Sequence, residues 1–317
     1  MGCPRSGTSY LYHLLLSAGG FAEFRTQMNV FDVLEPIFGD LRMPKSKKRL
    51  LDQWLSSKAF DVSGLTTAQV EQAVAQSSNG SDFLRFIMEA VACNQRVDRW
   101  VDSTPTNIPH IPRIKKDFPD ALFVHIIRDP RDVALSLDKR GWTRPLPWDG
   151  EQRLVAAGLY WEWIVRKGRK LGANLGKDYV EVRYEDLVND PADALQKLEG
   201  FLSHPLNYAH IRETSVGSVK NPLTSFKEDL KQGRFTPVGR WKDKFPARQL
   251  FLMESAIGEY MQELGYPLSA TAAETKRPKM TVKRLEYRLF YDFKQWAKIH
   301  TPLSRWMVSY SGILIDK

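Results

Sequence analysis

The first ten residues, MGCPRSGTSY, most constrain what the chain can fold into. Gly2 and Gly7 are separated by four residues, the spacing of a loop that surrounds a phosphate group. The apolar segment 9–17 follows directly and ends before a pair of glycines, which predicts a helix. A helix that opens on such a loop offers unpaired N–H groups and the positive end of its dipole. The sequence therefore predicts an anion site at this turn.

The other side chains of the loop favour the same chemistry. Arg5 supplies a planar cation for oxyanions, and Ser6, Thr8 and Ser9 supply hydroxyl donors. Thr8 stands where nucleotide triphosphatases carry a lysine, which argues against the usual nucleotide–magnesium arrangement. Because loops of this kind follow a buried strand, we expect that a strand is missing before Gly2.

Composition limits the class of protein and its partners. A chain of 317 residues with 43% apolar and 26% charged residues can bury a sizeable core. Its net charge of +9 favours anionic partners: a phosphorylated ligand, an acidic acceptor, a membrane surface or nucleic acid. Two cysteines make no disulfide framework, and the scattered histidines predict no metal site. Without a secretory signal or a membrane-spanning run, we expect a cytoplasmic location.

A second anion site is predicted farther along the chain. The apolar run 121–127 (ALFVHII) fits a buried parallel strand, and it ends in a charged turn that leads into a helix. Arg128 stands at the strand tip, with a surface ion pair as its alternative, and Ser136 stands about two helical turns farther on. Ligands bind at the carboxyl ends of strands in open α/β sheets.

The rest of the pattern predicts an α/β fold with a central, mainly parallel sheet flanked by helices. Residues 179–184 alternate like a strand. Helices are expected over 67–76, 82–94, 151–171, 247–264 and a segment that begins at Pro191. Residues 99–112 are expected to form a loop. Residues 21–65 have a mixed pattern: 21–40 is expected to form a short helix or loop after the first helix, and the basic run 45–49 is expected to be a solvated turn. Residues 233–242 form a basic loop suited to covering a nucleotide.

Taken together, these segments resemble the sulfotransferases that use 3′-phosphoadenosine 5′-phosphosulfate (PAPS). The loop at 4–9 is similar to the family's 5′-phosphosulfate loop, and 127–136 is similar to its 3′-phosphate motif. Residues 184–187, 224–226 and 239–242 resemble three further family segments, in the same order. The resemblance extends from Gly2 to about Tyr266 and implies a sulfotransferase domain of the P-loop type over 1–270.

The resemblance also implies how PAPS is held. Tyr10, Tyr184 and Phe226 would surround the adenine, and Arg234 would reach the 3′-phosphate from the covering loop. PAPS would be the co-substrate and 3′-phosphoadenosine 5′-phosphate (PAP) the product, with no metal required. The residues implied to contact the nucleotide are Arg5, Ser6, Gly7, Thr8, Ser9, Tyr10, Arg128, Ser136, Tyr184, Thr224, Phe226, Arg234 and Gly239.

The expected reaction is an in-line displacement at sulfur, by analogy with phosphoryl transfer. Arg5 would stabilise the leaving oxygen, and an acceptor hydroxyl or amine would need a base. The resemblance favours Asp102 as this base, with Glu23 as the second candidate and His110 as the third. The acceptor stays open among carbohydrate, lipid, small alcohol and peptide, and no nucleic acid is expected as a partner. The alternatives are a P-loop nucleotide kinase or triphosphatase and a non-catalytic PAP-binding relative.

The C-terminal segment 271–317 is expected to be a basic, amphipathic helical extension. Residues 276–317 hold ten Lys or Arg against three acids. Apolar residues recur there at helical spacing, and we expect this face to pack on the domain. The alternative is a helix that lies on an anionic membrane surface. The apolar residues are Leu285, Leu289, Phe290, Phe293, Trp296 and Ala297.

Overall fold

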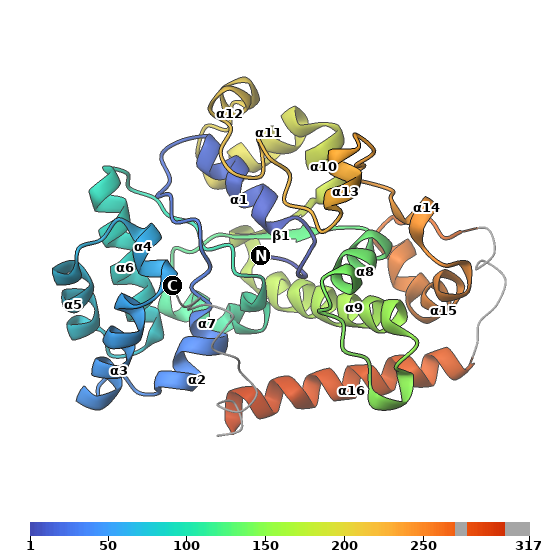
Figure 1. Ribbon diagram of the computed structural model, residues 1–317, viewed down its shortest axis with the longest axis horizontal. Coiled ribbons are helices and arrows are strands. Elements are labelled where there is room, and N and C mark those ends of the chain that lie inside the picture. The colour runs from blue at the N-terminus through green and yellow to red at the C-terminus, as the bar shows by residue number, and fades with distance from the viewer. Residues whose placement is uncertain (270–277, 302–317) are drawn as a thin grey trace.

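A small parallel sheet lies at the centre of the molecule, with helices on its faces (Figure 1). The structure, a computed structural model, describes residues 1–269 and 278–301. Strand β1 (Phe123–Ile127) pairs in parallel with β2 (Tyr179–Arg183) over their full lengths. Both strands lie where the apolar and alternating runs predict them, and the α/β class is confirmed.

The first two residues extend this sheet on the other side of β1. The Met1 amine donates to the carbonyl oxygen of Val124 at 2.8 Å, and the Ile126 N–H donates to the Met1 carbonyl at 2.9 Å. Gly2 forms a parallel bridge with Ile126, where an added Cβ would lie 2.5 Å from the Ile126 oxygen. Met1 and Gly2 thus occupy the position beside β1 that a strand before the loop would take.

The helices next to the sheet enclose two hydrophobic cores, one among α8, α9 and α15 and the other among α1, α10, α11 and α12. The aromatic-rich helix α9 packs against α8 and α15 and buries Trp161 and Val165 completely. These helices fall close to the predicted ranges, and Asp190 caps α11 as expected, accepting from the Asp193 N–H. The bounds are α1 (Thr8–Ser17), α8 (Pro130–Lys139), α9 (Arg153–Gly172), α10 (Tyr184–Asn189), α11 (Pro191–Leu202), α12 (Tyr208–Thr214), α13 (Lys227–Lys231), α14 (Trp241–Lys244) and α15 (Ala247–Glu263).

A third core lies among the helices of residues 30–95, around Trp54 and Phe83. Residues 21–40 form a loop followed by two short helices, in keeping with the expected short helix or loop, whereas the expectation of a turn at 45–49 is wrong. The basic run 45–49 belongs to α3 and is no turn: Pro44 opens that helix, and its apolar side is buried at Leu50 and Trp54. The bounds are η1, a π-helix (Val30–Leu34), α2 (Glu35–Phe38), α3 (Pro44–Leu55), α4 (Lys58–Ser63), α5 (Thr67–Gln76) and α6 (Gly80–Gln95).

The stretch 99–112 is a loop only in its first half. Residues 99–104 form no helix, and Arg99 forms a β-bridge with Phe21 and accepts the N–H of Ala22 at 2.7 Å. Prolines then open short helical turns, since a proline is tolerated at a first helical position. The bounds are η2 (Pro105–His110), α7 (Ile111–Asp117), and the turns η3 (Pro147–Asp149) and η4 (Ala173–Asp178).

Helix α16 (Pro278–His300) runs along the lower edge of the molecule in Figure 1 and packs on α9 and α15. The expected rotation of this helix is wrong. Tyr287 and Tyr291 face the domain and are buried, whereas most of the apolar face predicted to pack there is exposed. Ion pairs fix this rotation, because Arg284 reaches Glu162 and Lys298 lies 3.0 Å from Asp32. Residues 270–277 and 302–317 of the predicted extension lie outside the described residues.

Candidate active site

The phosphate loop has the backbone geometry of an anion site. Gly7 has φ +98°, and a Cβ there would lie 2.2 Å from the Tyr184 ring, so a side chain is excluded at this position. Arg5 is also left-handed, with φ 74°. Helix α1 begins at Thr8 with no side-chain cap and no acid in its first turn. Its first N–H groups and its dipole therefore remain available to an anion.

Arg5 joins the loop to the second predicted site. Its Nε donates to the Ser136 hydroxyl on α8 at 3.0 Å, and its guanidinium lies 5.8 Å from the Trp142 ring centroid. Burial, together with the charges of Arg140 and Arg128, lowers the pKa of Arg5 to about 10. Like charges crowded in this way favour the binding of an anion that neutralises them.

Arg128 stands at the tip of β1, as predicted. It is 6% exposed, so it does not form a surface ion pair; its nearest acid is the buried Asp132, at 3.9 Å. Its two terminal nitrogens donate to the carbonyls of Arg5 (3.0 Å) and Pro237 (2.6 Å), and its guanidinium lies 4.3 Å from the Tyr184 ring centroid. Its Nε is buried without a partner. The loop, the strand tip and the segment around Pro237 thus meet at one side chain.

The segment 233–242 is fixed over this site by α8. The buried Asp132 carboxylate accepts from the N–H groups of Gly239 (2.8 Å) and Trp241 (2.9 Å). This places the Arg240 guanidinium 4.1 Å from the Phe226 ring centroid, and the Arg240 Nε is buried without a partner. Burial, followed by the charge of Arg128, lowers the pKa of Arg240.

Two other residues predicted to contact the nucleotide, Tyr10 and Thr224, contact Tyr184 and Phe226. Tyr10 meets the Tyr184 ring edge-on with centroids 6.1 Å apart. Thr224 accepts the N–H of Phe226 at 3.0 Å. Arg234 is placed differently: it is exposed, and its guanidinium donates to Gln232. Its predicted contact with a 3′-phosphate stays a prediction.

Three side chains next to Arg5 and Ser136 were not predicted from the sequence. The Ser225 hydroxyl lies 3.2 Å from that of Ser136, and Arg140 and Trp142 border Arg5. Ser225 stands inside a recognised segment, so its neighbours could have indicated it. Arg140 and Trp142 follow α8, where the sequence shows no recognisable pattern.

Both oxygens of the Asp102 carboxylate accept hydrogen bonds. One oxygen accepts from the Thr104 N–H (3.0 Å) and hydroxyl (2.6 Å), and the other accepts from the Asn107 amide (2.7 Å). Burial lowers the pKa of the Met1 amine to about 6, and the charge of Asp102 opposes this shift. The charge of the Asp102 carboxylate therefore reaches the amine of Met1, the residue that precedes the phosphate loop.

The other two base candidates are placed differently. Glu23 is partly buried, with 41% of its side chain exposed, and pairs with Arg25 at 2.7 Å. His110 is buried, contacts Asp32 at 3.0 Å and stacks on Phe31. His110 therefore belongs to an internal contact between η1 and η2. In residues 1–269 and 278–301, no group of three or more His, Cys, Asp or Glu could hold a metal ion.

The chain belongs to the sulfotransferase family, since a model of that family matches residues 1–208. It is 23% identical, over 215 residues, to a Caenorhabditis elegans protein provisionally named a protein-tyrosine sulfotransferase. That match covers 65% of this chain and 77% of the relative. The chain is also 26% identical to human carbohydrate sulfotransferase 1 over 117 residues, which cover 36% of this chain and 28% of that protein.

Two solved structures share the fold. The sulfotransferase domain of the Synechococcus olefin synthase superposes with a TM-score of 0.55 at 18% identity, covering 84% of this chain and 94% of that one. The sulfotransferase domain of the curacin biosynthetic pathway gives a TM-score of 0.50 at 16% identity, covering 84% and 96%. The protein is therefore a sulfotransferase by family and by fold.

Proposed function

We propose that the chain transfers the sulfuryl group of PAPS to an acceptor hydroxyl. The observation that carries this proposal is a set of three buried donors without partners: the Ser6 hydroxyl, the Arg128 Nε and the Arg240 Nε. A buried donor without a partner costs about 1–3 kcal/mol, and an anionic ligand supplies the missing acceptors. The three donors come from the phosphate loop, the strand tip and the segment 233–242, which the Arg128 contacts bring together.

The two ends of the nucleotide would be held separately. The N–H groups at the start of α1, with Ser6 and Arg5, suit the 5′-phosphosulfate. Arg128, Ser136 and Arg240 suit the 3′-phosphate. Their contacts with Tyr184 and Phe226 leave aromatic surface beside the cations, which suits the adenine. This division would distinguish PAPS from ATP, which lacks a 3′-phosphate.

The transfer would be a single displacement. The acceptor oxygen forms a bond to sulfur while the bond between sulfur and the bridging phosphate oxygen breaks. Arg5 and the α1 N-terminus stabilise the charge that develops on the leaving phosphate. Asp102 accepts the acceptor's proton, and its contacts with Thr104 and Asn107 fix its orientation. Glu23 is the alternative base.

The names of two relatives support a hydroxyl acceptor. One relative is named for tyrosine and the other for carbohydrate, and both acceptors present a hydroxyl group. We therefore propose a hydroxyl acceptor and leave an amine as the second choice. The nucleotide-kinase reading has no support in the family match. The non-catalytic alternative predicts PAP binding without turnover.

Turnover of PAPS labelled in its sulfuryl group tests the proposal. The full chain is incubated with a tyrosyl peptide, an oligosaccharide and a simple phenol, and label transfer is followed together with PAP release. We expect acceptor-dependent PAP release that Asp102→Asn reduces. Tight PAP binding with no PAP release on any hydroxyl or amine acceptor would favour the non-catalytic alternative.

A further inference from the structure

Helix α16 presents an apolar stripe to solvent. Of the thirteen large apolar side chains that are exposed among the described residues, seven lie on this one helix. Five of them are 53–68% exposed and follow one another at intervals of three or four residues, so they share one side of the helix. The stripe consists of Val282, Leu285, Leu289, Phe293 and Trp296.

The stripe is a fixed feature of the surface. The opposite side of α16 is anchored by the buried Tyr287 and Tyr291 and by ion pairs of Arg284 with Glu162 and of Lys283 with Asp149. From Val282 to Trp296 the stripe is about 21 Å long at 1.5 Å per residue. A continuous apolar surface of this kind on a soluble domain marks a site of interaction.

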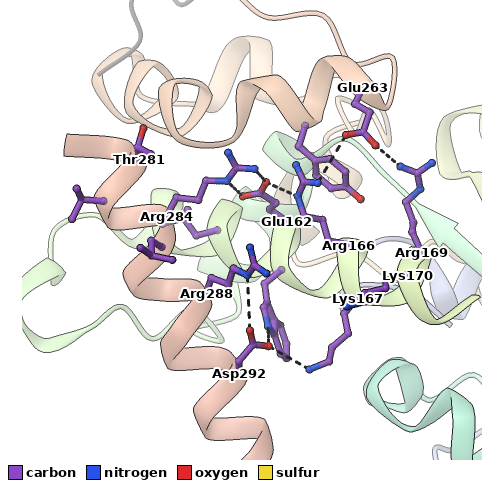
Figure 2. A pocket seen from close by; sticks show the side chains of 15 residues that line it. Glu162, Arg166, Lys167, Arg169, Lys170, Glu263, Thr281, Arg284, Arg288 and Asp292 are labelled. Carbon is purple, nitrogen blue, oxygen red and sulfur yellow. Dashed lines mark hydrogen bonds and ion pairs between the residues drawn. The ribbon is translucent and has the colours of Figure 1, made fainter. Parts of the chain in front are cut away.

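A basic cleft adjoins the stripe. It lies between α9, α15 and α16 and has a volume of about 820 Å³ (Figure 2). Val282 and Leu285 line both the cleft and the stripe, so the two surfaces are continuous. Six cations and three acids line the cleft: Arg166, Lys167, Arg169, Lys170, Arg284 and Arg288, against Glu162, Glu263 and Asp292.

The acids of the cleft are shared between cations. Glu162 pairs with both Arg284 and Arg166, as Figure 2 shows. Asp292 lies 3.5 Å from Lys167 and 4.0 Å from Arg288, which is 72% exposed. Glu259 lies 3.9 Å from Arg284 and Glu181 lies 3.0 Å from Arg169, while Lys170 on α9 and Lys279 and Arg288 on α16 are exposed. The cleft therefore presents positive charge next to apolar side chains.

We propose that α16 and this cleft form a docking surface for an anionic phospholipid bilayer. The stripe would enter the boundary between headgroups and acyl chains, and the cleft would face the lipid phosphates. Leucine and aromatic side chains on one side of a helix, bordered by Lys and Arg, are typical of helices that lie in this boundary. Charge complementarity favours the bilayer over a second apolar surface. The proposal does not depend on the identity of the sulfuryl donor.

Co-sedimentation of the full chain with lipid vesicles tests the proposal. The vesicles contain phosphatidylcholine alone or mixed with phosphatidylserine. We expect binding to the mixed vesicles that weakens as salt rises. Leu289→Glu with Phe293→Glu should reduce this binding by about tenfold or more, because both side chains leave the apolar phase. Arg288→Gln should reduce binding to the mixed vesicles by about fivefold, since one cation near the surface contributes about 1 kcal/mol.

The control is Met43→Glu with Val62→Glu, which places two acids on exposed apolar positions outside the stripe. It should bind as the unchanged chain does, and thermal unfolding checks that each variant is folded. Absence of sedimentation at low salt, or equal sedimentation of the unchanged chain and the Leu289/Phe293 variant, would overturn the proposal. So would a dimer in light scattering that this variant dissociates while vesicles are not bound, which would assign the stripe to a second copy.

Discussion

Replacement of Arg128 by alanine tests the 3′-phosphate site. The substitution removes a charge-assisted donor worth about 1.5–3 kcal/mol, so PAP should bind about 10- to 100-fold more weakly. It also leaves the carbonyls of Arg5 and Pro237 without their donors and removes the cation 3.9 Å from the buried Asp132. We therefore expect the ligand-free protein to lose about 1–3 kcal/mol of stability as well.

Calorimetry with two ligands separates these effects. PAP and adenosine 5′-phosphate differ by the 3′-phosphate, so Arg128→Ala should weaken PAP binding much more than adenosine 5′-phosphate binding. Arg128→Lys should be intermediate, because it keeps the charge and loses the planar fork. Arg248→Ala, at an exposed position, is the control with the same change of charge. Equal losses for the two ligands would refute the assignment of Arg128 to the 3′-phosphate.

Three further predictions concern the base, the loop and acid stability. Asp102→Asn should keep PAP binding and lower turnover by about 10²–10⁴-fold; a near-normal rate would move the assignment to Glu23. Gly7→Ala should lower the melting temperature and weaken PAP binding, because the new Cβ would meet the Tyr184 ring; an unchanged melting curve would contradict this geometry. Burial lowers the pKa of His125 to about 3, below the unfolded value of about 6.5, so stability is lost as pH falls through this interval. In urea titrations, the free energy of unfolding should fall by about 2 kcal/mol more between pH 7 and pH 5 in the unchanged chain than in His125→Gln. Equal decreases in the two proteins would show that His125 does not contribute.

The sequence predicted the central elements because their signals are local. An unbroken apolar run specified β1, alternation specified β2, and two glycines specified the loop. Helices α3 and α4 were missed because they lie in a stretch of mixed composition with a basic run near its start. The basic side of α3 resembles a solvated turn until the burial of Leu50 and Trp54 is known.

The rotation of α16 could not be predicted from its own sequence. The helix has two apolar sides, one with tyrosines and one with leucines and larger apolar residues, and periodicity alone favours the latter. The choice is made by partners far away in the chain: Glu162 for Arg284 and Asp32 for Lys298. The arginine cluster around Arg5 is hidden for the same reason, since Arg140 joins it only through the fold.

The central claim is that the two anion sites hold PAP and PAPS. Its most direct test is calorimetric titration of the full chain with PAP and, separately, with ATP and Mg²⁺ at the same ionic strength. Contacts with a 3′-phosphate worth about 1.5–3 kcal/mol predict that PAP binds at least tenfold more tightly than ATP. ATP binding as tight as PAP binding, or tighter, would contradict the account.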